Sequence, residues 1–139
     1  MSDKFNLQRF VAAQNPVIQN VLSELQTGSK QTHWMWFIFP QIAGLSGSII
    51  AQRFAISSLG EADAYLRHSV LGPRLYDCTQ RVNLVDGQTA NQIFGYPDDL
   101  KFRSSMTLFR EATAENVVFE EALQKYFGGK PDVLTLERL

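Results

Sequence analysis

The chain has 139 residues, of which 45% are hydrophobic and 19% charged, and its net charge is -1. This length is typical of a single soluble domain with one core, which we place over residues 1–139. The near-neutral charge argues against nucleic-acid binding, and no apolar stretch is long enough to span a bilayer. Cys78 is the single cysteine, which excludes an intrachain disulfide and a cysteine-based zinc cluster. We therefore expect a cytoplasmic protein with no nucleic-acid or membrane partner and no cofactor.

Turn and capping residues divide the chain into predicted helices. A short first helix ends near Gln14, and Asn15-Pro16 starts a second, whose apolar residues share one arc until Gly28 ends it. The remaining predicted helices are, in chain order, His33–Gln41 ended by Pro40, Ile49–Ile56 after a cap at Ser48, Glu61–Arg67, Pro73–Val85, a turn from Thr89 through Phe94, Pro97–Thr113, Val117–Phe127 and a last turn from Asp132 through Leu136. No βαβ alternation is visible, so the prediction is an all-α, single compact domain of seven to nine mostly short helices.

The run His33–Gln41 is the most unusual segment of the sequence. Both tryptophans and two phenylalanines fall within the six positions 34–39, and such a block must be buried. A buried strand also fits this run, since it is apolar all round. Trp34 and Trp36 point different ways in a helix, so that one can face the core and the other a cavity. His33 is interpreted either as a core-edge histidine bonded to a carbonyl or as an acid/base group.

A second segment, Pro97–Phe109, directs polar residues inward. Asp98, Lys101 and Ser105 recur at i, i+3 and i+7, among apolar side chains. An inward lysine must find a partner, lower its pKa or reach a hydrated pocket. Two interpretations stay open. Either Asp98 is the helix N-cap and the stem of Lys101 lies over Phe102, or these residues line a pocket with Ser104.

Other chemistry has weaker support in the sequence. His33 and His68 lack the spacing of a metal site, so no metal is predicted. Ser104 or Ser105 as a nucleophile, with Lys101 as its base, is geometrically allowed, but helical serines usually bond to a carbonyl. Arg74 lies in a first helical turn, where a cation is mildly unfavourable, so it is expected to have a specific partner, either a carboxylate of this chain or a ligand phosphate.

The motifs His33–Gln41, Leu71–Leu75, Asp98–Lys101 and Ser104–Phe109 together resemble a known family. It is a family of small bacterial and fungal proteins called domain of unknown function 1810, and its members are sometimes mislabelled calpastatin. The resemblance spans nearly the whole chain. It implies an all-helical fold, and it implies no established activity, cofactor or catalytic residue. Phe54 stands where many relatives are expected to have a tyrosine.

From these observations we hypothesise a ligand pocket between the His33–Gln41 helix and the Pro97–Phe109 helix. Aromatic rings beside an amide, an ammonium and hydroxyls suit a small anionic or nucleotide-like ligand. The candidate lining residues are His33, Trp36, Gln41, Asp98, Lys101, Ser104 and Ser105, with Trp34, Arg74 and Thr107 as secondary candidates. Whether a reaction is catalysed stays open, and Lys101 or His33 would do its acid/base work. The alternative is a protein-protein interaction or structural module with no pocket, for which a homodimer is one form.

Overall fold

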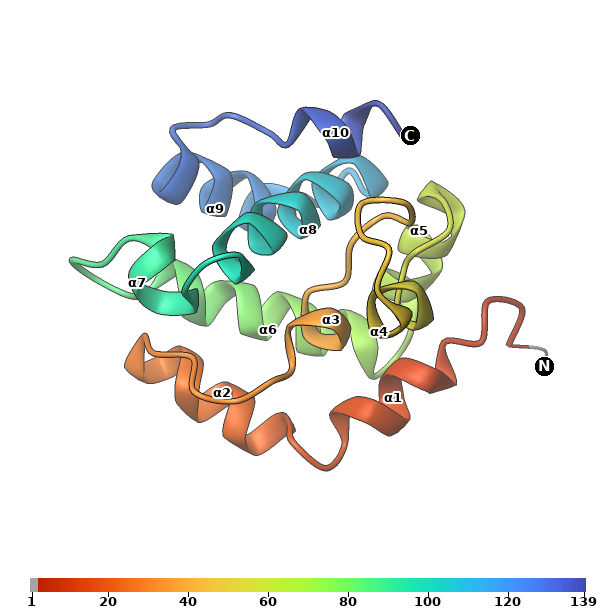
Figure 1. Ribbon diagram of the computed structural model, residues 1–139, viewed down its shortest axis with the longest axis horizontal. Coiled ribbons are helices and arrows are strands. Elements are labelled where there is room, and N and C mark those ends of the chain that lie inside the picture. Colours follow the sequence, from red (N-terminus) through yellow and green to blue (C-terminus); the bar gives the residue numbers. More distant parts are fainter. Residues whose placement is uncertain (1–2) are drawn as a thin grey trace.

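The chain folds into helices joined by short turns, as the sequence predicts. Within residues 3–139, which the computed structural model describes, there are ten helices and no β-strand (Figure 1). They are α1 (Gln8–Gln14), α2 (Ile18–Thr27), α3 (Met35–Ile38), α4 (Ile49–Arg53), α5 (Leu59–Arg67), α6 (Leu71–Asn83), α7 (Ala90–Phe94), α8 (Asp98–Ala112), α9 (Val117–Phe127) and α10 (Val133–Leu136). The all-α prediction is confirmed. The count of seven to nine is wrong, because the two segments predicted as single turns form the separate helices α7 and α10.

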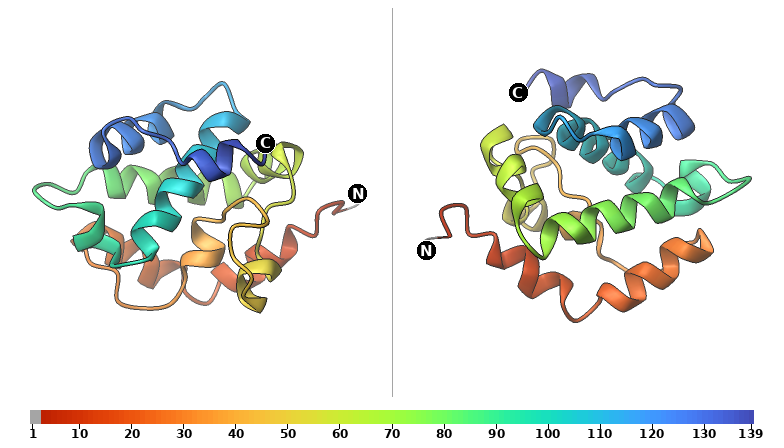
Figure 2. Two further views of the ribbon diagram at one scale, coloured as in Figure 1. Left: turned by 45° about the horizontal axis from the view of Figure 1, so that its top comes forward. Right: turned by 180° about the vertical axis from the view of Figure 1, so that it is seen from behind.

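The longer helices form the frame of the molecule. α6 lies between α2 and α9, and α8 packs along α9 while also contacting α5, α7 and α10. Seen from behind, α6 crosses the middle of the molecule between α2 and the blue C-terminal helices (Figure 2). No helix within residues 3–139 is long and apolar enough to cross a bilayer. Because α8 packs against α5, α7, α9 and α10, it is covered on more sides than a surface helix. Polar residues of α8 are buried as a result.

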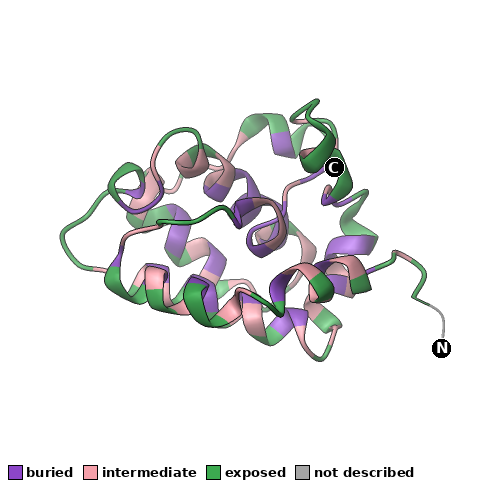
Figure 3. Ribbon diagram, turned by 60° about the horizontal axis from the view of Figure 1, so that its bottom comes forward, coloured by how far each residue is buried: buried purple, intermediate pink, exposed green. Residues whose placement is uncertain are grey.

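Aromatic side chains fill the core around α8. Phe102 of α8 lies with its ring centre 5.0 Å from that of Phe39 and 4.7 Å from that of Phe94. Phe39 and Phe94 are themselves in edge-to-face contact at 5.9 Å, an arrangement that adds to the stability from burial alone. Along each longer helix, buried and exposed positions alternate with the helical period (Figure 3). The middle of α8 differs, since residues 104–109 are all buried.

Most of the predicted helix ends coincide with observed caps. The side chains of Ser48, Thr89 and Asp132 accept hydrogen bonds from backbone N–H groups of α4, α7 and α10, which confirms the three predicted caps. Gly28 ends α2 in the left-handed conformation, with φ of 73°, where glycine carries no steric penalty. α4 stops at Arg53 instead of Ile56, because the Ile56 N–H bonds to the carbonyl of Gln41.

The predicted start of the second helix is wrong. Asn15 caps nothing, because its backbone is still helical and its N–H bonds to the carbonyl of Val11, so that it ends α1. α2 begins two residues after Pro16, and Val17 precedes it without a side-chain cap. The residues of the capping signal are present, but Asn15 serves as the C-cap of the first helix instead of the N-cap of the second.

Arg9 joins three segments at the edge of the core. Its five N–H donors all have acceptors, which are the carbonyl oxygens of Phe5, Asn6, Arg53 and Ala55 and a carboxylate oxygen of Glu61. Glu61 is only 2% exposed, and its other oxygen accepts from the N–H and hydroxyl of Ser57. A buried carboxylate needs such partners. The guanidinium therefore ties the N-terminal segment to the turn between α4 and α5.

We predict that Arg9→Lys destabilises the protein by about 3 kcal/mol, because an ammonium cannot reproduce five diverging hydrogen bonds and leaves partly buried acceptors without a donor. Urea unfolding at neutral pH measures the loss. The matched control is Arg67→Lys, which alters the exposed pair with Asp63 and should change stability by less than about 0.5 kcal/mol. Equal losses in the two variants would contradict the anchoring role of Arg9.

Candidate functional site

The two tryptophans of the aromatic run lie in different surroundings. Trp34 is buried, and its indole N–H donates to a carboxylate oxygen of Glu24 at 3.1 Å. Trp36 is only partly buried, and the ammonium nitrogen of Lys101 lies 4.6 Å from the centre of its ring. This distance is typical of a cation–π contact. The first turn of α8 and the aromatic run are thus brought together, as the pocket hypothesis requires.

Three charged side chains meet beside these rings. The ammonium of Lys30 lies 2.9 Å from one oxygen of Asp98, and that of Lys101 lies 3.3 Å from the other. Lys30 also lies over Trp34, at 5.1 Å from a ring centre. The side chains of Lys30, Asp98 and Lys101 are 8%, 19% and 20% exposed. Two cations therefore share one carboxylate in a largely buried place, and one positive charge has no counter-charge within the cluster.

A cleft opens next to this cluster. It lies between the loop that follows α3, the first half of α8 and the start of α10, and its volume is about 290 Å³. Its lining residues are Gln41, Leu45, Ser46, Pro97, Leu100, Lys101, Arg103, Ser104, Asp132 and Leu134. Trp36 and Gln41 border an adjacent hollow of about 10 Å³, which is room for a single water. Gln41, Lys101 and Ser104 of the predicted lining thus share the cleft.

The hydroxyls of Ser104 and Thr107, both predicted in the lining, hold α10 against α8. The Ser104 hydroxyl donates to Asp132 Oδ2 at 3.0 Å, and the Asp132 N–H donates to Thr107 Oγ1 at 2.9 Å. Arg103, which also belongs to α8, donates hydrogen bonds to the carbonyl oxygens of Lys130 and Pro131. These bonds fix the position of Asp132 at the cleft. Sequence reasoning saw Asp132 only as a helix cap, because its contact with α8 is a tertiary one.

The other predicted residues lie outside the cleft lining. His33 is exposed, and no hydrogen bond to its ring occurs within residues 3–139. Ser105 is fully buried, and its hydroxyl has no partner among the residues described. Asp98 is the first residue of α8 and Pro97 precedes it without a side-chain cap, so the N-cap interpretation of Asp98 is wrong.

Arg74 has a specific partner within this chain, but the partner is an amide instead of the predicted carboxylate. Its guanidinium donates to the side-chain oxygen of Gln14 at 3.3 Å. Gln14 is 1% exposed, and its amide nitrogen donates in turn to the carbonyl of Phe37 and the hydroxyl of Tyr65. Burial raises the pKa of Tyr65 well above its usual value. Arg74 therefore completes a buried network that joins α1, α5 and α6 behind α3.

Cys78 is not placed for nucleophilic chemistry. The side chain is 1% exposed, and burial raises the pKa of its thiol to about 12. The thiolate is the reactive form of cysteine. At neutral pH the thiol of Cys78 therefore stays protonated and packs as a small apolar group of α6.

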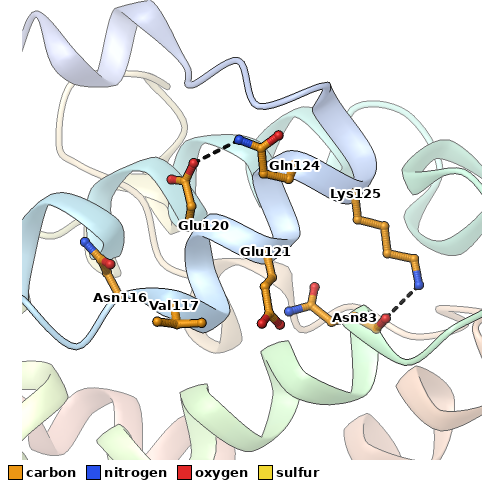
Figure 4. A pocket seen from close by; sticks show the side chains of 7 residues that line it. All are labelled: Asn83, Asn116, Val117, Glu120, Glu121, Gln124 and Lys125. Atoms are coloured by element: carbon orange, nitrogen blue, oxygen red, sulfur yellow. Dashed lines mark hydrogen bonds between the residues drawn. The ribbon is translucent and has the colours of Figure 1, made fainter.

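A larger hollow, of about 590 Å³, lies away from these residues, between the end of α6 and α9 (Figure 4). Several of its polar side chains are engaged within the protein. Glu120 accepts hydrogen bonds from Gln124 and Arg110, and the ammonium of Lys125 donates to the carbonyl of Asn83. The side-chain oxygen of Asn83 is buried without a partner among the residues described. Size alone does not mark a binding site. We place the candidate site at the smaller cleft beside Lys101, because two cations share a single carboxylate there.

The fold and this cleft define a small all-helical protein with a partly buried cationic cluster. The chain belongs to a family described as protein of unknown function (DUF1810), whose model matches residues 4–139. Among solved structures it is similar to the conserved hypothetical protein Rv1873 from Mycobacterium tuberculosis. The two are 55% identical over 99% of this chain and 98% of the other, with a TM-score of 0.98. No curated protein matches the chain. The resemblance seen in the sequence is confirmed, and the function of the family is unknown.

Glu24, which orients Trp34, gives a prediction for pH dependence. Burial raises the pKa of this carboxyl, but hydrogen bonds from Gln31, Thr32 and Trp34 outweigh burial and hold it below the ordinary 4.5. Because the pKa of Glu24 is lower in the folded protein than in the unfolded chain, its hydrogen bonds stabilise the fold at a pH above 4.5. This stabilisation is lost as the pH falls through the pKa of the folded state. Glu24→Gln should lower stability by about 1 kcal/mol at neutral pH.

Urea unfolding of both proteins from acid to neutral pH measures this effect. The difference between wild type and Glu24→Gln should shrink as the pH falls below 4.5. Glu115→Gln, at an exposed carboxylate, serves as the control and should leave stability within about 0.5 kcal/mol. A constant difference across this pH range would contradict the assigned role of Glu24.

Proposed function

We propose that the protein binds a small organic anion in the cleft beside Lys101. The observation that carries the proposal is the shared carboxylate: Lys30 and Lys101 both pair with Asp98, so one positive charge is left over. Charges that are partly removed from water are screened less than surface charges. Lys101 brings this positive charge to the cleft, where a ligand can reach it.

The walls of the cleft restrict the kind of anion. Leu45, Leu100 and Leu134 provide apolar surface, and Gln41 adds an amide. The volume of about 290 Å³ lies at the lower end of the range for small-molecule sites, roughly 300 to 1,000 Å³. A small molecule with one anionic end and an apolar body therefore suits the cleft. The proposal concerns binding alone, because the hydroxyl of Ser104 is engaged with Asp132.

Two substitutions test this proposal, and they should change the affinity for anions in opposite directions. Lys101→Met removes the cation at the cleft and should weaken anion binding at least about tenfold. Asp98→Asn removes the competing carboxylate and should strengthen binding several-fold, although it also destabilises the fold, because Lys30 and Lys101 lose their shared counter-charge. Lys4→Met, at an exposed lysine away from the cleft, is the control for net charge and should bind like wild type.

Isothermal titration calorimetry measures these affinities, with acetate, 4-methylpentanoate, benzoate, inorganic phosphate and adenosine monophosphate as probes. A thermal shift of the wild type with the same compounds provides an independent readout, because a ligand that binds the folded state raises the melting temperature. The proposal is lost if none of the five compounds binds the wild type, or if Lys101→Met binds them as the wild type does.

A second function, self-association, is favoured by a different observation. Three apolar side chains next to the cleft remain exposed, namely Leu100 at 47%, Val133 at 62% and Leu134 at 61%. Exposed apolar residues that cluster on one side often belong to an interface. Because α8 and α10 are in contact, these side chains form one surface on which a second copy of the chain would pack.

Light scattering coupled to size exclusion tests self-association. If a homodimer forms, its mass should appear at high protein concentration, and Val133→Ser should return the protein to the monomer. Val133 does not line the cleft, so this variant should leave anion binding unchanged. A monomeric wild type at all concentrations removes the homodimer and leaves the anion site as it stands.

A further inference from the structure

We infer that the ligand of the cleft is a zwitterion, a small amino acid with an aliphatic side chain. This inference rests on the proposed function, since it places the ligand carboxylate near Lys101. It adds a second contact, in which the ligand ammonium meets the carboxylate of Asp132. Both protein side chains line the same cleft.

The two oxygens of Asp132 are used unequally. Oδ2 accepts from the hydroxyl of Ser104 at 3.0 Å, from the N–H of Thr135 at 3.2 Å and from the hydroxyl of Thr135 at 2.6 Å. Within residues 3–139, no hydrogen bond reaches Oδ1, and this oxygen is accessible to solvent. The carboxylate is therefore fixed in place through one oxygen while the other can accept from a ligand.

Asp132 also lacks a charged partner. Among the residues described, no lysine, arginine or histidine nitrogen lies within 4.0 Å of its carboxylate, although Lys101 and Arg103 line the same cleft. A carboxylate that accepts only from neutral donors has no counter-charge beside it. A ligand ammonium would compensate its negative charge, whereas a ligand hydroxyl would only add one more neutral hydrogen bond.

Lys101 and the residue that holds Asp132 lie one helical turn apart. Ser104, whose hydroxyl contacts Asp132, follows Lys101 on α8 at i+3, a separation of about 5 to 6 Å between Cβ atoms. An α-amino acid carries its ammonium and carboxylate on the same carbon, so one small molecule presents both charges to the two side chains that line this cleft. Its side chain would then contact the apolar wall made by Leu45, Leu100 and Leu134.

The test compares leucine with two analogues that each lack one charge. 4-Methylpentanoate keeps the carboxylate and the aliphatic chain, and 3-methylbutylamine keeps the ammonium and the chain. Calorimetric titration of the wild type should give leucine a Kd at least about tenfold lower than that of either analogue. Valine and isoleucine, titrated alongside, show which aliphatic side chain fits best.

Asp132→Asn assigns the second contact. Asparagine keeps an oxygen that can accept from Ser104 and Thr135, and it remains a good N-cap for α10. It replaces the open oxygen by an amide that repels an ammonium. The advantage of leucine over 4-methylpentanoate should disappear, while the affinity for 4-methylpentanoate does not fall, because the substitution removes a carboxylate that repels an anion. Asp86→Asn, at an exposed aspartate in the loop between α6 and α7, is the control and should bind leucine like the wild type.

The outcomes separate the two proposals. If 4-methylpentanoate binds as tightly as leucine, the zwitterion is excluded and the anion site stands. If 3-methylbutylamine alone binds, or if none of the compounds binds, both proposals are overturned. Should Asp132→Asn fail to fold, the comparison of the three compounds on the wild type still decides the question.

Discussion

The buried aromatic run is the constraint on which the rest of the structure depends. Trp34 and Phe39 must be removed from water, and α8 supplies Phe102 as the surface that covers them. Lys30 and Lys101 are carried to the edge of this aromatic layer, where their ammonium groups lie over the two tryptophans. At such positions water is scarce, so the lysines need a counter-charge, and Asp98 provides the single one that they share. The cationic character of the cleft thus follows from how the aromatic core is packed.

Local signals predicted the fold well. Ser48, Thr89 and Asp132 cap their helices because side-chain oxygens near the start of a helix satisfy free N–H groups, a rule that needs no tertiary information. The same reasoning failed at Asn15, a good capping residue that ends the first helix instead of starting the second. It failed also at Ile56, whose N–H is taken by Gln41 from another segment. Errors arose where a distant partner decided a local conformation.

At the site, too, local contacts were predicted and contacts between distant parts of the chain were missed. The pair of Asp98 with Lys101 was predicted, because residues at i and i+3 of a helix meet. Lys30 was missed as a partner of Asp98, since no periodicity links two residues so far apart in the chain. Ser104 was predicted in the pocket because it faces inward on its helix. The helical period alone cannot show that its hydroxyl bonds to Asp132, which lies far away in the sequence. His33 lies one residue from Trp34, and yet its side chain faces solvent.

The burial of Cys78 has a practical consequence for studies in solution. The chain contains no other cysteine, and this thiol is both covered and protonated at neutral pH. A maleimide reagent would therefore find no reactive native sulfur, because such reagents attack the thiolate. A cysteine introduced on the exposed surface of α10 would be the unique attachment point for a fluorophore. The wild-type background is thus already suited to reporting on the cleft by fluorescence, with no need to remove a residue from the core.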